Sequence, residues 1–270
     1  MTCNFSSFIF FNPVLKPGYL INGIPKTGSK KKEIKMKKSI ILSIFIFSVA
    51  VQYAQGQTAD EIISKNIEAM GGRQKILTLS SALMTGTFTA AGSPAINITV
   101  TKKHLVGSRI DIEVNGIKNY QLITPTNGWI YTPVQGDQEP RPLQEGQVKA
   151  GQVQLDLHGP FLDHKEKGIK IEMTGKDTVN GSTCYKLQVS APNGNVTIYS
   201  IDSKSYFIVK TSNKMFQYAA WEDVITTYGD YRKNADGFWF AYNFTSPRGD
   251  TKYENIVANV PVSDDLFKIK

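Results

Sequence analysis

The chain is poor in the residues that most enzymes and metal centres use. Its 270 residues include two cysteines and three histidines. We find no G-x-S-x-G elbow, no H-E-x-x-H pair, no phosphate-binding glycine loop and no C-x-x-C motif in it. Cys3 lies in an N-terminal region that we expect to be removed, so Cys184 cannot form an intramolecular disulfide. These absences favour a protein that is not an enzyme and needs no cofactor.

An apolar stretch long enough for an ordinary membrane span is also missing. The longest apolar run, residues 40–50, has about a dozen residues, whereas a spanning helix needs roughly 20. Two lysines precede this run and Ala54-Gln55-Gly56 follows it, which is the pattern of a secretory signal peptide. We predict a signal peptide over residues 36–56 and export to the periplasm of a Gram-negative bacterium.

Residues 1–35 precede a signal that is already complete. Met36 is a natural start, and Lys32-Glu33 is compatible with a ribosome-binding site in the underlying DNA. One hypothesis is that translation begins at Met36 and that residues 1–35 are a non-native upstream extension. The alternative is an unusually long n-region of the signal.

Basic charge is nearly absent from the predicted mature part. Residues 1–56 carry +7 of the formal net charge of +8, which leaves residues 57–270 close to neutral. That segment shows no basic stripe and no arginine cluster, so a nucleic-acid partner is not expected. It is long enough for a single domain with its own core.

The mature part begins with a helical pattern and continues with strands. Thr58 and Glu61 have capping-box spacing, isoleucines follow at helical spacing, and Gly71-Gly72 ends the pattern. About a dozen short runs rich in Val, Ile, Thr, Phe and Tyr then alternate with turn formers such as Asn115-Gly116. We therefore predict a mainly β fold with a few helices, built as one large, strongly curved antiparallel sheet or barrel.

Residues 134–167 interrupt this pattern. They are rich in Gln, Gly, Glu and Pro, and their apolar residues lack strand alternation. A long insertion of this kind is often functional. We expect a loop with one or two short helices over the sheet, in which Leu155, Leu157 and Phe161 form a movable cover.

Four residues of this insertion are of types that bind metal ions: Asp156, His158, Asp163 and His164. Their spacing matches no metal-binding template, and Gly159-Pro160 turns the chain between the two halves. We predict no metal site and expect solvated loop side chains. His104 is expected at an exposed strand end.

Aromatic residues are the more informative group. Phe238, Phe240, Tyr242 and Phe244 alternate along one predicted strand and share one face. An ordinary sheet core explains them. A curved sheet with only two or three helices also leaves its concave side unfilled, which would create a cavity for an apolar guest. We predict that these four residues, with Trp129 and Tyr131, line that cavity.

Several motifs occur in an order that resembles a known family. They are Glu68-Ala-Met-Gly-Gly72, Gly128-Trp-Ile-Tyr-Thr-Pro133, His158-Gly-Pro-Phe161, Gly175-Lys-Asp-Thr-Val-Asn-Gly181, Cys184-Tyr-Lys-Leu187 and Asp264-Asp-Leu-Phe267. Their order resembles that of the LolA/LolB-like outer-membrane lipoprotein-sorting proteins, especially divergent ones from Bacteroidetes-type bacteria.

The resemblance implies an unclosed antiparallel β-barrel whose concave face is covered by helices and binds acyl chains. It also implies a monomeric periplasmic carrier of a lipid or an acylated lipoprotein, with donor and acceptor proteins at membranes. The founding carriers hold the lid closed with an arginine on an early strand, and Arg109 is the only arginine of the early strands here. Two alternatives remain at this point: a protein-interaction or envelope-stress sensor module without lipid cargo, and a hydrolase or metal enzyme that uses His158 and His164.

Overall fold

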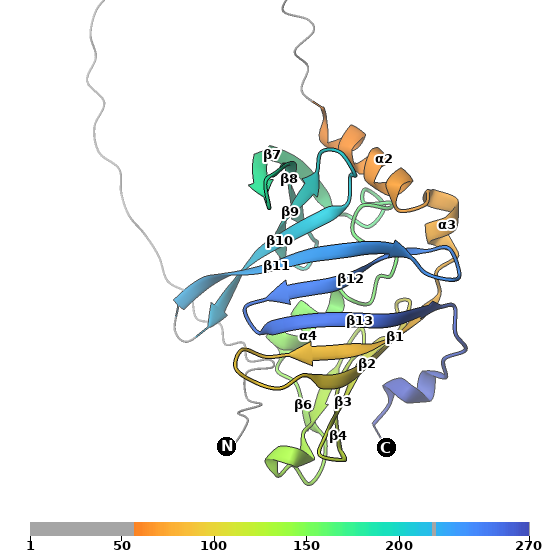
Figure 1. Cartoon of the computed structure of the whole chain (residues 1–270), viewed down its shortest axis with the longest axis vertical. Coiled ribbons are helices and arrows are strands. Elements are labelled where there is room, and N and C mark those ends of the chain that lie inside the picture. The colour runs from red at the N-terminus through yellow and green to blue at the C-terminus, as the bar shows by residue number, and fades with distance from the viewer. Residues whose placement is uncertain (1–56, 218–219, 270) are drawn as a thin grey trace, which may run out of the picture. The chain divides into compact units, whose positions relative to one another are not determined.

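A computed structural model describes residues 57–217 and 220–269 (Figure 1). The predicted upstream extension and signal peptide, residues 1–35 and 36–56, lie outside the described residues. The described elements from Ala59 onward belong to one compact unit. Among the described residues, no helix has the length and apolar character that crossing a membrane requires.

Thirteen strands form one sheet, and all of the paired neighbours are antiparallel. In chain order they are β1 Ser81–Thr89, β2 Ile96–Lys103, β3 Gly107–Val114, β4 Ile117–Ile123, β5 Gly128–Tyr131, β6 Arg141–Pro142, β7 Lys170–Val179, β8 Ser182–Ser190, β9 Val196–Asp202, β10 Ile208–Gln217, β11 Ala220–Lys233, β12 Trp239–Ser246 and β13 Gly249–Ala258.

Strand order explains why the sheet is open. The order is β6-β5-β4-β3-β2-β1-β13-β12-β11-β10-β9-β8-β7, so the first strand pairs with the last at the centre of the sheet. The two free edges are therefore β6 and β7, which are consecutive in the chain. The connection between them, residues 143–169, has to travel from one edge of the sheet to the other. This connection is most of the insertion that the sequence pattern singled out.

Short hairpins set much of the register. Asn115 and Gly116 join β3 to β4 with φ values of 53° and 78°, and Asn180 and Gly181 join β7 to β8 with 48° and 79°. Positive φ at both central residues gives a turn whose twist matches that of the flanking strands, and Asn and Gly tolerate it best. The turn predicted at Asn115-Gly116 is therefore confirmed, and Asn180-Gly181 forms a second hairpin of the same kind.

Within residues 57–217 and 220–269, the helical elements are few and short. They are α2 Ala59–Ala69, α3 Arg73–Leu77, α4 Glu145–Gln152, the 3₁₀ turn η3 Pro133–Gln135 and the 3₁₀ turn η4 Asp264–Phe267. Helix α2 ends where predicted, because Gly71 and Gly72 adopt φ values of 110° and 85°. Its apolar stripe buries Ile62 and Ile63 against Leu187, Val189 and Ile201 of the sheet.

We call the sheet face that carries Leu187, Ile201, Val100 and Met84 the covered face, because α2 and the 143–169 connection pack on it. At one end of this face α2 contacts β7 to β9. Towards the other end, α4 packs closely on β4. Gly151 of α4 lies so near Ile123 that a Cβ added to the glycine would stand 2.9 Å from the Ile123 side chain. Burial of this apolar face is the main stabilising term of the fold.

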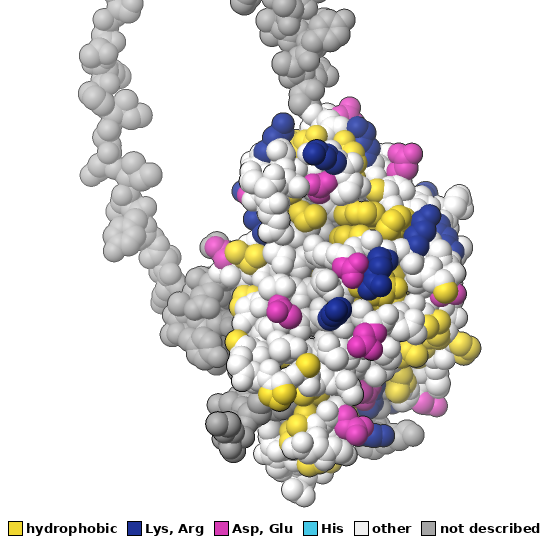
Figure 2. Space-filling view, in the orientation of Figure 1, with side chains coloured by type: hydrophobic (Ala, Val, Ile, Leu, Met, Phe, Trp, Pro, Cys, Tyr) yellow, Lys and Arg dark blue, Asp and Glu magenta, His cyan; other side chains and the backbone are white. Residues whose placement is uncertain are grey.

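The opposite face is mixed in character over the region that Figure 2 presents. There, basic and acidic side chains are interspersed among apolar ones, without a block of one sign (Figure 2). The 3₁₀ turn η4 lies against this face, where the ring of Phe267 packs on Gly107. Cys184 is fully buried and unpaired, as its isolation in the sequence indicates.

The structure extends the sequence-based strand assignments in two places. The insertion contains one more short strand, β6, because Arg141 and Pro142 pair with Ile130 and Trp129 of β5. Strand β7 continues to Val179 across a register shift near Gly175. The prediction of a loop with a short helix in the insertion is confirmed by α4.

Candidate functional site

The four aromatic residues of β12 lie together on the covered face. Register pairs Phe244 with Thr251 of β13, which in turn faces Phe88 of β1. Phe238 and Tyr242 are 4% and 5% exposed, and Phe240 and Phe244 are half-buried. Their neighbours are the aliphatic side chains of β1, β2 and β3, among them Met84, Ile98, Val100 and Ile110. The central part of the covered face is thus a continuous apolar and aromatic surface.

Edge-to-face contacts order these rings. The ring of Phe244 stands 5.3 Å from that of Tyr228 and 5.5 Å from that of Tyr253, at interplanar angles of 76° and 79°. Such T-shaped pairs are favoured by the aromatic quadrupole. Burial raises the pKa of Tyr253 to about 12, so its phenol is neutral at physiological pH.

Trp129 and Tyr131 do not join this set. Trp129 pairs with Leu122 and then with Arg109 across β3 to β5, whereas the covered-face row of the same strands runs through Ile130, Gln121 and Ile110. Because directly paired residues share a face and neighbours along a strand alternate, Trp129 and Tyr131 lie on the opposite face. The six predicted lining residues therefore do not line one surface. The prediction was wrong because alternation shows which residues of one strand share a face, but it does not show which faces of two distant strands lie on the same side of the sheet.

Two of the three predicted cover residues, Leu157 and Phe161, pack on the covered face, and the third, Leu155, is 4% exposed. Leu157 packs with Phe238 and Phe240, together with Leu79 and Ala258. Phe161 packs on the α2 side, with its ring 5.3 Å from that of Tyr199. We call residues 153–168 the cover segment. Leu157 and Phe161 bridge two hydrophobic clusters of the sheet, and each is in contact with the surface that a guest would need.

Arg109 has a different environment from a lid-closing residue. It lies on the opposite face, where its guanidinium donates to Asp111 at 2.8–3.0 Å and covers the ring of Tyr120 at 4.0 Å. Its Nη1 also donates to the carbonyl of Leu266 in η4, at 3.5 Å. In this chain, Arg109 contacts the C-terminal turn and does not contact the cover segment.

Two hollows open elsewhere on the molecule. One of about 400 Å³ is lined by residues of β5, β6 and α4, including Trp129, Leu143 and Val148. Another, of about 510 Å³, lies where β2 meets the segment after β13, beside Lys103 and Pro261. Neither is lined by the aromatic residues of β12, because Leu157 already occupies the surface beside Phe238 and Phe240.

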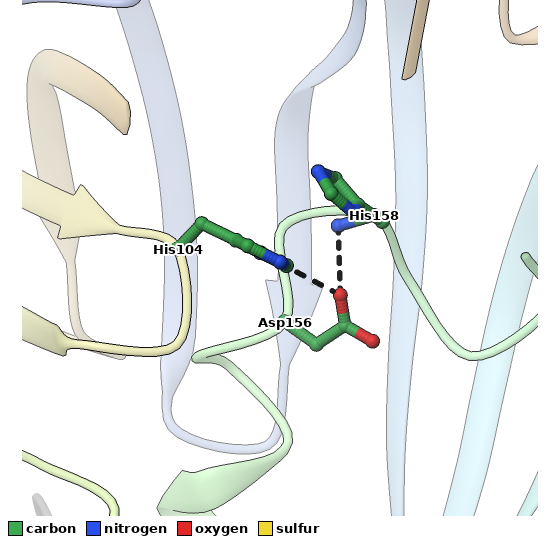
Figure 3. A group of neighbouring side chains, drawn as sticks. All are labelled: His104, Asp156 and His158. Carbon is green, nitrogen blue, oxygen red and sulfur yellow. Dashed lines mark hydrogen bonds and ion pairs between the residues drawn. The ribbon is translucent and has the colours of Figure 1, made fainter. Parts of the chain in front are cut away.

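A histidine pair fixes the start of the cover segment (Figure 3). His104 follows β2, and its Nδ1 accepts a hydrogen bond from the Leu157 amide at 3.2 Å. The imidazole of His158 stacks on that of His104, with ring centroids 3.8 Å apart, and its Nε2 lies 3.2 Å from the carbonyl of Leu79. We call His104, Asp156 and His158 the histidine cluster.

Asp156 completes the histidine cluster. Its Oδ1 accepts from the His158 amide at 2.9 Å and lies 3.7 Å from Nδ1 of His104 (Figure 3). Its Oδ2 accepts from the ammonium of Lys167 at 2.5 Å. The pKa of His104 is lowered, first by burial and then by the neighbouring His158. His104 is therefore neutral at physiological pH, in the tautomer whose Nδ1 can accept.

The histidine cluster brings ligand-type atoms within 4.8 Å of one another, but its contacts oppose a metal ion. A metal would need the Nδ1 lone pair of His104, which the Leu157 amide already uses, and the carboxylate of Asp156, which Lys167 neutralises. Stacked rings also direct their in-plane lone pairs side by side, whereas a common metal needs them to converge. The cluster acts as a clamp that attaches the cover segment to β2.

The sequence-based grouping of polar residues was wrong in its membership. Asp163 pairs with Arg73 of α3, and His164 lies 3.3 Å from the carbonyl of Phe161 and 3.9 Å from Asp60. Only Asp156 and His158 of the four stay together, and His104 joins them. His104 is half-buried, not exposed as predicted, because the cover segment folds back over the end of β2. No local motif connects His104 to residues 156–158, which lie about fifty positions further along the chain.

Comparison with known proteins places the fold. No family model matches the sequence, and no curated protein matches it. Among solved structures, a DUF1329 family protein from Desulfovibrio piger is similar with a TM-score of 0.54 and 13% identity, over 79% of this chain and 98% of that one. A LolA superfamily protein from Nitrosomonas europaea gives 0.52 and 12%, over 79% and 98%.

A third similar structure is a putative outer membrane lipoprotein-sorting protein domain from Vibrio parahaemolyticus, with a TM-score of 0.51 and 11% identity, over 77% of this chain and 95% of that one. The chain thus has a LolA-like fold: mainly β, with an antiparallel sheet that does not close and few helices. At these identities the likeness establishes the fold alone.

Proposed function

We propose that this protein is a non-enzymatic periplasmic carrier that binds a lipid or lipoprotein acyl chain on the covered face, between the sheet and the cover segment. The observation that carries the proposal is the contact of Leu157 with Phe238 and Phe240. The cover segment places Leu157 and Phe161 on an apolar and aromatic surface, and polar contacts hold its start at the histidine cluster. Two similar structures, a LolA superfamily protein and a putative lipoprotein-sorting domain, support the same proposal.

Physical chemistry makes this surface suited to an alkyl guest. Each CH₂ moved from water to an apolar environment contributes about 0.8 kcal/mol, so a carrier needs apolar area that can be exposed and covered again. The closed arrangement described above protects that area in the absence of a guest. Loading then requires Leu157 and Phe161 to move away from the sheet while α2 and β1–β13 stay in place.

The first test is native mass spectrometry of the protein, expressed as the full chain and purified from a bacterial periplasm. We expect a mature chain that begins at Gln57 and a co-purifying lipid or acylated peptide, released by organic extraction. A clean apo mass that does not change on titration with fatty acid, phospholipid and a model lipopeptide would contradict the carrier function and favour a protein-interaction module.

A pair of matched variants locates the guest. Phe240→Asp places a carboxylate on the covered face and should abolish loading in a folded protein. Tyr131→Asp makes a similar change on the opposite face and should leave loading intact. Equal loading of the two variants would remove the covered face as the binding surface.

A further inference from the structure

Lys102 places an ammonium group on the central part of the covered face. Lys102 is the next covered-face residue after Ile98 and Val100 along β2, and both of these are buried members of the central apolar cluster. Its direct neighbours across the strands are Ala82 of β1 and Ser108 of β3, which are 0% and 3% exposed. Both neighbouring side chains are small, and neither carries a charge that could pair with the ammonium of Lys102.

The cover segment and α4 enclose this position. The row of paired residues across the sheet runs Ile123, Ser108, Lys102, Ala82 and Ala258. Gly151 of α4 lies against Ile123 at one end of the row, and Leu157 packs on Ala258 at the other. Lys102 therefore lies in the middle of the row, beneath the part of the chain that connects Gly151 to Leu157.

Lys102 has no anionic partner in the described part of the chain: no hydrogen bond or ion pair joins it to another described residue. Asp156, the acidic residue of the cover segment nearest in sequence to Leu157, pairs with Lys167 and the histidine cluster instead. Burial alone lowers the pKa of Lys102 to about 8, although part of its surface stays accessible. The ammonium is therefore desolvated and has no counter-ion among the described residues.

An unpaired ammonium in such surroundings is costly, and an arriving anion would relieve that cost. Next to it, the covered-face residues of β2 from Val100 to Ile96 extend the apolar surface, and the six residue steps from Lys102 to Ile96 span ~20 Å at about 3.3 Å per step. A guest that fits both features has an anionic headgroup and an alkyl chain.

We propose that Lys102 binds the anionic headgroup of the guest, a carboxylate or a phosphate, while the guest's alkyl chain lies on the apolar part of the covered face. This inference rests on the proposed acyl-chain binding and narrows it to anionic amphiphiles. Fatty-acid carboxylates and phospholipid phosphates share the required chemistry, and the two sources are separated by experiment.

The test is calorimetric titration of the purified protein with palmitate, with dipalmitoyl phosphatidylglycerol and with 1-hexadecanol, whose alkyl chain matches palmitate but whose headgroup is neutral. We expect palmitate or phosphatidylglycerol to bind about tenfold or more tightly than hexadecanol, as a charge-assisted hydrogen bond of about 1.5–3 kcal/mol implies. The tighter of the two anionic probes identifies the headgroup class.

Neighbouring lysines provide the matched control. Lys102→Met should remove the preference for the anionic probe and leave hexadecanol binding unchanged. Lys103→Met, on the opposite face where Lys103 donates to Asp264 at 2.6 Å, should leave the preference intact. Lys102→Arg should retain the preference and shows that the site tolerates substitution.

The pH dependence gives an independent readout. Because Lys102 loses its charge above about pH 8, the preference of the wild type for palmitate should shrink as the pH rises through that value, whereas Lys102→Arg should keep it to pH 9.5. If palmitate and hexadecanol bind equally, and Lys102→Met changes neither, the headgroup inference is wrong and acyl binding stands. If no probe binds the wild type, the proposed function itself fails.

Discussion

Acidification should release the start of the cover segment through His104. The Leu157 amide donates to Nδ1 of His104 at 3.2 Å, and that nitrogen can accept only while it is unprotonated. His104 faces His158, Asp156 and Lys167, and its pKa is lowered by burial and by His158. An exposed histidine takes up a proton near pH 6.5, so the contribution of this contact is fully present above that pH. It declines as the pH falls towards the lower pKa of the packed state.

The size of the effect follows from the hydrogen bond. Protonated Nδ1 presents an N–H to the Leu157 N–H, so a partly buried donor loses its acceptor, at a cost of about 1–3 kcal/mol. That free energy corresponds to roughly a five- to 150-fold larger open population of the segment. Between the pKa of His104 in the exposed state and its pKa in the packed state, protonation of this one residue changes the free energy of opening by at most about 1.4 kcal/mol per pH unit.

Amide hydrogen exchange of Leu157, corrected for the intrinsic rate, measures this population directly. We expect its protection to fall between pH 7.5 and 5 while amides of the central strands keep theirs. His104→Asn places a non-titrating oxygen near the position of Nδ1 and should remove the pH dependence, whereas His164→Asn, outside the histidine cluster, should retain it. Unchanged protection of the wild-type Leu157 amide down to pH 5 would refute the clamp.

Three further predictions concern stability and are checked by urea unfolding. Leu187→Ala should lower the unfolding free energy by about 2–5 kcal/mol because Leu187 is fully buried between α2 and the sheet; a loss below 1 kcal/mol would contradict that packing. Gly107→Ala should cost about 1–3 kcal/mol, since its Cβ would stand 2.3 Å from the ring of Phe267, and Phe267→Ala in the same chain should relieve the clash. Lys210 holds the pKa of Asp177 below its usual value, so this pair stabilises the fold above about pH 4 and does so less as the pH falls. Asp177→Asn should therefore make the unfolding free energy fall less steeply at acidic pH. An unaltered pH dependence in that range would refute the pairing.

Local sequence signals predicted much of the fold. Asn115-Gly116 and Asn180-Gly181 fixed two hairpins, and Gly71-Gly72 fixed the end of α2, because each depends on backbone conformations that few residue types adopt. The alternation along residues 238–244 fixed which side chains of β12 share a face. These features are determined within a few residues, so they can be read without the rest of the chain.

The sequence also indicated, by its lack of alternation, that residues 134–167 are not ordinary sheet. It could not show that this stretch must cross the covered face. That follows from the pairing of β1 with β13, which leaves β6 and β7 as the two edges of the sheet.

Tertiary structure alone decided the composition of the candidate site. The phase between β5 and β12 depends on the register of the six strand pairs that connect them, so Trp129 and Phe240 could not be assigned to different faces from their own alternation. His104 meets residues 156–158 only because the connection between the sheet edges folds back over the end of β2. Contacts between segments distant in the sequence are set by topology and packing, and no spacing along the chain encodes them.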